Sequence, residues 1–121
     1  MHRHIAGLIV SVCWATSSYA GPIVQDVGTG DFYERVDLNG VTWLDARDMA
    51  AAKSHLGLVG HLATITSQAE TDFLLANLPV TGLGQPTEFW LGGFQNTSSP
   101  SFSEPGGGWE WITAEALAYT N

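Results

Sequence analysis

The chain has 121 residues, of which 45% are hydrophobic and 13% are charged, enough to bury the core of one domain. Its formal net charge is −8, from 4 Lys and Arg against 12 Asp and Glu. Nucleic acids and anionic membranes need clustered basic residues, so this balance argues against both as partners. It fits an exported protein with a cation-attracting surface, although an acidic surface can also serve solubility alone.

The first twenty residues have the pattern of a secretory leader. Arg3 gives a basic start, and an apolar run follows from Ile5 to Trp14. That run is too short to span a bilayer, which takes about 20 residues. Ser18-Tyr19-Ala20 places small residues at the two positions that signal peptidase reads. We therefore expect residues 1–20 to be a signal peptide, with a buried N-terminal helix as the alternative, and no membrane span in this chain.

Cys13 is the one cysteine of the sequence, and it lies inside the expected leader. Val12 stands before it, where a lipoprotein cleavage site has a small residue, so we expect no lipid anchor. The mature chain would then contain no disulfide. Residues 21–31 form a short glycine-rich lead without a clear period, and residues 32–121 are expected to form the folded domain.

A strand and a helix open this domain. Phe32–Val36 mixes aromatic, charged and β-branched residues, which predicts an edge strand. Thr42 then predicts a helix N-cap, with Asp45 completing a capping box. Gly57 predicts the end of the helix. The expected apolar face of the helix consists of Trp43, Ala46 and Ala50.

A second strand and helix follow. Leu62–Ile65 predicts a strand, and Ser67 with Glu70 predicts a second capping box. Pro79 predicts the end of this helix, whose apolar stripe consists of Phe73, Leu74 and Leu78. Two more strands are expected, at Phe89–Leu91 and Trp109–Trp111, with loops at Val80–Thr87 and Asn96–Gly108. This order of elements predicts an α+β fold.

Four segments in this order resemble the C-type lectin-like family. The residues that carry the resemblance are Trp43, Ala46 and Ala50; Gly60, His61 and Leu62 with Glu70 and Phe73; Trp90, Leu91 and Gly92; and Trp109, Trp111, Tyr119 and Asn121. Together they cover most of residues 32–121. The resemblance implies two helices with small antiparallel sheets, in a chain truncated before the long ligand loop and the last strands.

The resemblance also has departures. Ala50 replaces a cysteine of many members, which implies the disulfide-free version found in exported bacterial proteins. The family's Glu-Pro-Asn or Gln-Pro-Asp triplet and its Trp-Asn-Asp triplet, which hold calcium and sugar, do not occur. Glu104-Pro105-Gly106 echoes the first triplet but lacks an oxygen ligand at Gly106. The sugar-binding residues and the calcium site are therefore expected after Asn121, in the complete protein.

Several residues have both a functional and a structural interpretation. Glu70 is a weak candidate for an auxiliary calcium ligand, but its capping box explains it equally well. His61 is expected to fix a turn by hydrogen bonding rather than to hold a metal. The indoles could stack on sugar rings, but their positions on apolar faces favour core packing. These indoles belong to Trp43, Trp90, Trp109 and Trp111.

The sequence offers little for catalysis, because it has no nucleophile elbow, no phosphate-binding loop and no mature cysteine. The acidic pairs Asp45/Asp48 and Glu110/Glu115 could serve an exported hydrolase in principle, although solvent exposure explains them better. We expect a non-enzymatic binding module, with carbohydrate binding through calcium in the complete protein. The alternative is a calcium-independent domain that binds protein or serves as a surface scaffold.

Overall fold

The computed structural model describes residues 5–11, 19–37, 40–78, 89–115 and 117, with only the backbone described for 5–11, 19–21 and 37. Its elements in chain order are β1 (Ile5–Ser11), β2 (Tyr19–Gln25), β3 (Phe32–Asp37), α1 (Trp43–Ala51), β4 (Ser54–His55), β5 (Leu58–His61), α2 (Gln68–Asn77), β6 (Phe89–Trp90), β7 (Gly93–Gln95) and β8 (Trp109–Trp111). This is a mixed α+β fold with two helices, as the sequence predicts. Within these ranges, no helix is long and apolar enough to cross a bilayer.

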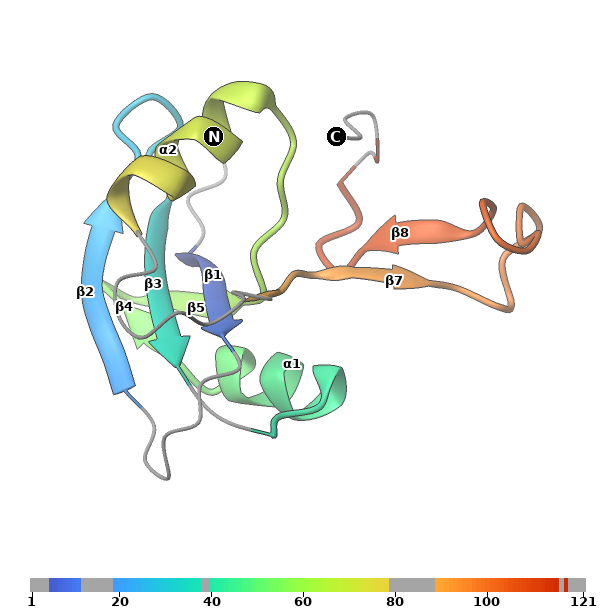
Figure 1. The fold of residues 1–121 in the computed structure, drawn as a ribbon, viewed down its shortest axis with the longest axis horizontal. Helices are drawn as coiled ribbons and strands as arrows, with labels where there is room; N and C mark the ends of the chain where they lie inside the picture. Colours follow the sequence, from blue (N-terminus) through green and yellow to red (C-terminus); the bar gives the residue numbers. More distant parts are fainter. Residues whose placement is uncertain (1–4, 12–18, 38–39, 79–88, 116, 118–121) are drawn as a thin grey trace.

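Six strands form the main sheet, in the order β2-β3-β1-β5-β4, with β6 also paired to β1. β1 runs parallel to β3 and β5 and antiparallel to β6. We call this sheet with its two helices the body. β7 and β8 form a separate antiparallel pair that projects from the body with its connecting loop (Figure 1), and we call residues 93–111 the arm.

Two hydrophobic clusters lie on opposite faces of the sheet, because successive residues of a strand point to opposite sides. The first cluster, toward α2, consists of Tyr33, Ala63, Leu74 and Leu78, with Phe73 packed against it. The second cluster, toward α1, consists of Val36, Ala46, Ala50 and Leu62. The apolar faces predicted for both helices are therefore confirmed, and each helix covers one side of the body.

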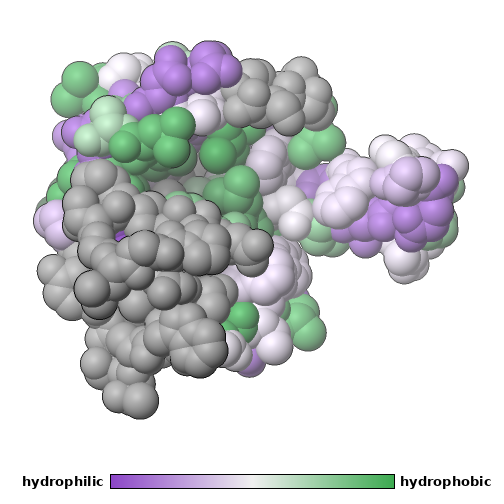
Figure 2. Space-filling view, viewed as in Figure 1, coloured by the Kyte–Doolittle hydropathy of each residue, from purple (hydrophilic) through white to green (hydrophobic). Residues whose placement is uncertain are grey.

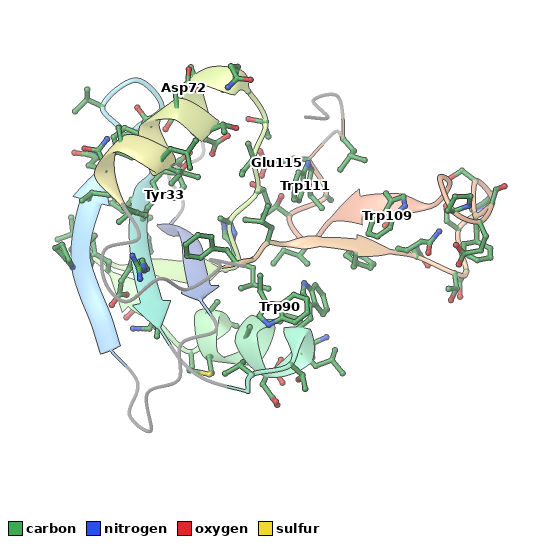
Figure 3. The ribbon with its side chains drawn as sticks, viewed as in Figure 1. Tyr33, Asp72, Trp90, Trp109, Trp111 and Glu115 are labelled. Atoms are coloured by element: carbon green, nitrogen blue, oxygen red, sulfur yellow. The ribbon has the colours of Figure 1, made fainter. Side chains whose placement is uncertain are left out.

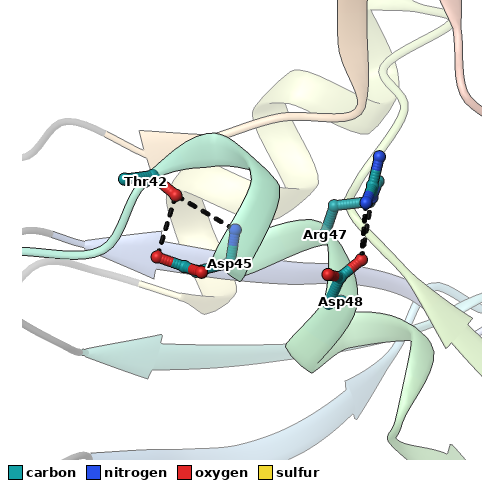
Figure 4. Close-up of polar contacts among 4 residues, drawn as sticks. All are labelled: Thr42, Asp45, Arg47 and Asp48. Atoms are coloured by element: carbon teal, nitrogen blue, oxygen red, sulfur yellow. Dashed lines mark hydrogen bonds and ion pairs between the residues drawn. The ribbon is translucent and has the colours of Figure 1, made fainter.

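Both helices begin at the predicted N-cap residues. The Thr42 hydroxyl accepts a hydrogen bond from the Asp45 N–H at 3.1 Å, and the Ser67 hydroxyl accepts one from the Glu70 N–H at 3.1 Å. The reciprocal bond of a capping box differs in each case. The Asp45 carboxylate accepts from the Thr42 hydroxyl at 2.8 Å rather than from its N–H (Figure 4). The Glu70 carboxylate accepts from the N–H of Thr66, the residue before the cap, at 2.7 Å.

Two expectations about strands were wrong. β3 is an interior strand, between β2 and β1, rather than an edge strand. The charged groups of its side chains have partners within the fold. Glu34 forms an ion pair with Lys53, and the Arg35 guanidinium lies 5.9 Å from the centre of the Phe89 ring. The glycine-rich lead was the second error, because Tyr19–Gln25 forms β2 by backbone pairing that its irregular sequence does not reveal.

The end of α1 and the following strand were also misplaced. α1 ends at Ala51, and Gly57 lies instead in the turn between β4 and β5. Leu56 and Gly57 have φ values of 51° and 79°, as a two-residue hairpin turn requires. A glycine can end a helix or make such a turn, so the sequence alone could not separate the two. The strand expected at Leu62–Ile65 lies instead at Leu58–His61, as β5, and residues 62–65 follow it without regular secondary structure.

Ile5–Ser11 is an extended, paired strand, so the alternative of an N-terminal helix is wrong for these residues. The signal peptide itself stays a prediction. The loop expected at Val80–Thr87, the predicted helix stop at Pro79, and the motif residues Tyr119 and Asn121 lie outside the described residues.

Candidate functional site

The motif residues meet where α1, β5 and β6 come together. Ala46, Ala50 and Leu62 belong to one buried cluster. A side chain at Gly60 would lie 2.4 Å from the Ala50 carbonyl oxygen, and one at Gly92 would lie 2.9 Å from that of Leu62. Both glycines are thus needed for close backbone approach.

Indole and imidazole hydrogen bonds hold the same region together. The Trp43 indole N–H donates to the Leu91 carbonyl at 2.8 Å, which ties α1 to the segment after β6. His61 donates from Nδ1 to the Leu62 carbonyl at 2.7 Å, the hydrogen-bonding role that the sequence predicts. These motif residues therefore stabilise the fold, and residues that could contact a ligand lie elsewhere.

The four tryptophans of the expected domain differ in exposure, which corrects the expectation that all of them pack in the core. Trp111 is 9% exposed and Trp43 is half-buried, whereas Trp90 is 37% and Trp109 is 46% exposed. Trp109 and Trp111 share one face of β8, as the alternation predicts. The prediction failed for Trp109 because alternation identifies a face of a strand and not what covers it. Figure 3 shows Trp111 at the root of the arm and Trp109 farther out.

The arm has two unlike faces, set by its pairing register. Gly93 pairs with Trp111 and Gln95 with Trp109, so these four residues lie on one face. A side chain at Gly93 would lie 3.3 Å from the Trp111 ring, which shows that this indole covers the glycine. Phe94 lies on the other face, where its ring centre is 6.0 Å from that of Trp43. One face thus rests on α1, while the other presents Trp109 to solvent.

The Trp109 indole is fixed in place although it is exposed. Its N–H donates to the Pro105 carbonyl at 3.1 Å. The connecting loop is closed by hydrogen bonds from Gln95 Nε2 to the Gly107 carbonyl at 2.8 Å and from the Asn96 N–H to the Gly108 carbonyl at 2.7 Å. An exposed aromatic ring with little freedom to lose is suited to ligand contact, because binding then costs less conformational entropy.

The arm around Trp109 is rich in polar residues. The arm contains Glu104 and Glu110 and no Lys or Arg. Glu110 accepts a hydrogen bond from Asn96 Nδ2 at 3.1 Å. Figure 2 shows the arm as a mainly hydrophilic or pale projection beside a body with hydrophobic patches. An indole among amide and carboxylate groups can stack on the apolar face of a sugar ring or on a side chain of a protein ligand.

A polar cluster lies at the root of the arm. Glu115 accepts hydrogen bonds from the buried Thr64 hydroxyl at 2.8 Å and from the Thr113 hydroxyl at 2.6 Å. Figure 3 shows Glu115 beside Trp111. Among the described residues, the buried Trp111 indole N–H has no hydrogen-bond partner. The sequence did not indicate Thr64, because a threonine between β5 and α2 gives no sign of its distant partner.

The acidic pairs considered for catalysis engage separate partners. Glu110 bonds to Asn96 on the arm, whereas Glu115 bonds to Thr64 and Thr113 at its root. On α1, Asp45 bonds to Thr42, and Asp48 forms an ion pair with Arg47 at 2.8 Å (Figure 4). The absence of an enzymatic activity stays a prediction.

Glu70 is buried, with 4% exposure, and both of its carboxylate oxygens have protein partners. One accepts from the Tyr33 hydroxyl, and the other accepts from the N–H and the hydroxyl of Thr66 at 2.7 and 3.2 Å. Burial and the hydrogen bond to Glu70 raise the pKa of the Tyr33 hydroxyl well above its ordinary value. This geometry accounts for Glu70 as a link between β3 and α2 without a metal ion.

In the part of the chain that the structure describes, no group of three or more His, Cys, Asp or Glu side chains could hold a metal ion. This observation does not bear on the calcium site that the resemblance implies, because that site is expected after Asn121.

Two known proteins are similar to this chain. Halomucin of Haloquadratum walsbyi is 39% identical over 93 residues, which cover 77% of this chain and 1% of halomucin. Lithostathine of Bos taurus, a C-type lectin-like protein, is 36% identical over 78 residues, which cover 64% of this chain and 41% of lithostathine. No family model matches the chain, and no solved structure matches it. The lithostathine match agrees with the motif resemblance, and both matches suggest a lectin-like or surface binding module.

Proposed function

We propose that this chain is part of an exported, non-enzymatic binding module of the C-type lectin-like type. The observation that carries this proposal is the exposed Trp109 indole, fixed on a projecting arm in a chain similar to lithostathine. In the complete protein, the ligand is a carbohydrate held through calcium, and Trp109 supplies an aromatic contact to the apolar face of a sugar ring. Halomucin is surface-associated and lithostathine is secreted, which supports export.

The arm supports binding better than catalysis. Its polar groups are used in hydrogen bonds that hold the loop, such as those of Gln95 and Asn96, rather than converging on one reacting atom. General acid–base catalysis needs a positioned proton donor and acceptor around a common substrate atom. A fixed aromatic ring on a projecting surface needs no such convergence to bind a ligand.

A glycan array with a matched pair of variants tests this function. The complete protein is applied with calcium and with a chelator, followed by W109A and W90A. Trp90 is the control because it is also exposed and its indole N–H is also held by a carbonyl, that of Val41, at 2.8 Å. We expect chelation to abolish glycan binding. W109A should weaken glycan binding about tenfold, which corresponds to about 1.4 kcal/mol. W90A should leave the affinity within about twofold of the parent.

The second candidate function is calcium-independent binding of a protein ligand by the same arm. It is favoured by the same exposed Trp109 indole, which can also stack on a side chain of a protein ligand. Glycan binding that is absent in both buffers, with a protein ligand retained in chelator and weakened by W109A, would establish this alternative. Equal effects of W109A and W90A on every ligand would remove the arm from either function.

A further inference from the structure

A polar side chain stands beside the exposed indole on the Trp109 face of the arm. Gln95 of β7 lies directly opposite Trp109 of β8 in the pairing register. Side chains of directly paired residues point to the same face, with Cβ atoms about 4.5–5.5 Å apart. Gln95 is half-buried, whereas Trp109 is 46% exposed on the projecting arm (Figure 3). A molecule in contact with the indole therefore lies within reach of the Gln95 side chain.

The Gln95 amide has one permitted orientation. Its Nε2 donates to the Gly107 carbonyl oxygen at 2.8 Å. Only the nitrogen end of an amide can face a carbonyl oxygen, because the Oε1 end has no hydrogen to donate. Rotating the amide by half a turn would place two acceptors against each other. Oε1 must therefore point away from Gly107.

This oxygen atom is available to a ligand. Gln95 Oε1 accepts no hydrogen bond from the described residues. It is also not one of the fully buried atoms that lack a partner in that part of the chain, so it contacts solvent. An amide oxygen has two lone pairs and accepts from a hydroxyl or an N–H group. Oε1 can thus bind a donor without breaking the bond that Nε2 makes to the loop.

The same loop holds the indole and the amide in place relative to each other. The Pro105 carbonyl accepts from the Trp109 indole N–H at 3.1 Å, and the Gly107 carbonyl accepts from Gln95. A fixed aromatic ring with a fixed acceptor beside it loses little conformational entropy on binding. Such a pair fits a pyranose, which has an apolar face for the ring and hydroxyl groups around its edge.

The charges of the arm favour a neutral donor over an anion at this position. Glu104 and Glu110 are the charged residues of the arm, which contains no Lys or Arg. A carboxylate or sulfate group beside Oε1 would place acceptor against acceptor, with no cation of the arm to compensate. A hydroxyl group supplies the hydrogen that Oε1 lacks.

We propose that Gln95 Oε1 accepts a hydrogen bond from one hydroxyl of the sugar unit that stacks on Trp109. Gln95 is then a specificity-determining residue of the arm. The site takes a sugar in which this hydroxyl is free, and it discriminates against the same sugar when that position is deoxygenated, methylated or anionic. This inference rests on the proposed carbohydrate binding. Stacking on Trp109 does not require Gln95, so carbohydrate binding can hold where this inference fails.

The test changes Gln95 and single ligand hydroxyls together. The complete protein is labelled with fluorotryptophan, and the fluorine resonance of Trp109 is assigned by its loss in W109F. Methyl glycosides of mannose, galactose and N-acetylglucosamine are titrated in calcium and in chelator, each with its monodeoxy derivatives. The titrations are repeated with Q95M, which keeps the length of the side chain and removes the amide.

The matched control is N96L. Asn96 also carries an amide that holds the arm, since its Nδ2 donates to Glu110 at 3.1 Å. It lies on the other face, because Glu110 pairs with Phe94 rather than with Gln95. A purely structural role of either amide would weaken the binding of every derivative by the same factor. A hydrogen bond to Oε1 instead couples Q95M to one hydroxyl.

We expect one deoxygenation to weaken binding to the parent by about three- to tenfold, as the loss of one hydrogen bond does. The same deoxygenation should cost less than about twofold in Q95M, whereas N96L should show the loss seen in the parent. Equal losses in the parent and in Q95M at every ring position would overturn the inference and leave carbohydrate binding in place. If none of the three sugars shifts the Trp109 resonance in either buffer, the proposed function fails together with this inference.

A solvent isotope shift of the same resonance tests whether this face is open in the complete protein. An exposed Trp109 should change its chemical shift between H2O and D2O, and a saturating sugar should reduce that change. If the change is absent before sugar is added, the protein's own chain covers the face, and the proposal is overturned.

Discussion

The body and the arm are held together in different ways. Tyr33 and Leu62 in the body are fully buried, and each belongs to a cluster that a helix covers. The arm is held by hydrogen bonds of its backbone and amide side chains, which leaves Trp109 and Phe102 exposed. A change in the body should therefore alter stability, whereas a change in the arm should alter binding and leave stability nearly constant.

The largest expected effect is that of L62A in the body, with F102A in the arm as its matched control. Leu62 is 0% exposed and Phe102 is 36% exposed. L62A leaves a cavity and should lower the free energy of unfolding by about 2–5 kcal/mol. F102A should lower it by about 0.5 kcal/mol or less. Chemical denaturation measures both, and similar losses would show that the arm is part of one cooperative core.

A pair of glycine variants sharpens the comparison. A side chain at Gly60 in the body would lie 2.4 Å from the Ala50 carbonyl oxygen, and one at Gly107 in the arm would lie 2.3 Å from that of Ser101. Both variants force a local shift, but only G60A separates α1 from β5. We expect G60A to lower the free energy of unfolding by about 1–3 kcal/mol, as overpacking does.

G107A should instead disturb the loop that positions Trp109. The melting temperature should stay within about 2 °C of the parent, while ligand binding falls as it does for W109A. A large loss of stability in G107A, or full binding, would contradict the separation of the two regions.

The buried pair of Tyr33 and Glu70 makes the stability of the body depend on pH in the alkaline range. Burial and the bond to Glu70 raise the pKa of the Tyr33 hydroxyl above its ordinary value of 10.0. The folded chain therefore keeps this proton at a pH where the unfolded chain releases it. The resulting stability is fully present below about pH 10 and falls by about 1.4 kcal/mol per pH unit above it.

Y33F is the control for this dependence, because it removes the titrating group and keeps the ring. Denaturation curves from pH 9 to 11 should show a shallower fall for Y33F than for the parent. Parallel curves for the two proteins would show that Tyr33 ionises in the folded state as it does in the unfolded state.

Sequence patterns between nearby residues predicted much of the structure of the body. The capping residues Thr42 and Ser67 and the apolar faces of both helices follow from contacts between residues three or four positions apart. Such rules work because both partners stand close together in the chain. The mixed α+β class follows from the order of these elements.

Other features depend on partners far away in the sequence. Glu34 and Arg35 suggested an edge strand, because their distant partners Lys53 and Phe89 cannot be seen locally. Likewise, the bond between Thr64 and Glu115 joins residues 51 positions apart. The exposure of Trp109 depends on what lies over the arm, which no alternation pattern reports. The candidate site was thus the least predictable part of the molecule.

The smallest expected effect separates an ion pair of the body from a polar contact of the arm. E34Q removes the charge that pairs with Lys53, whose side chain is 34% exposed against 13% for Glu34. E110Q is the same substitution in the arm, and a glutamine oxygen can still accept from Asn96 Nδ2.

Partly exposed ion pairs are worth about 0.2–1 kcal/mol, so E34Q should lower the free energy of unfolding by up to about 1 kcal/mol in low salt. That loss should shrink as salt is added, because screening weakens the parent's ion pair, while E110Q stays near the parent throughout. If E110Q had the larger effect, the arm would be stabilised by charge rather than by the hydrogen bonds that close its loop.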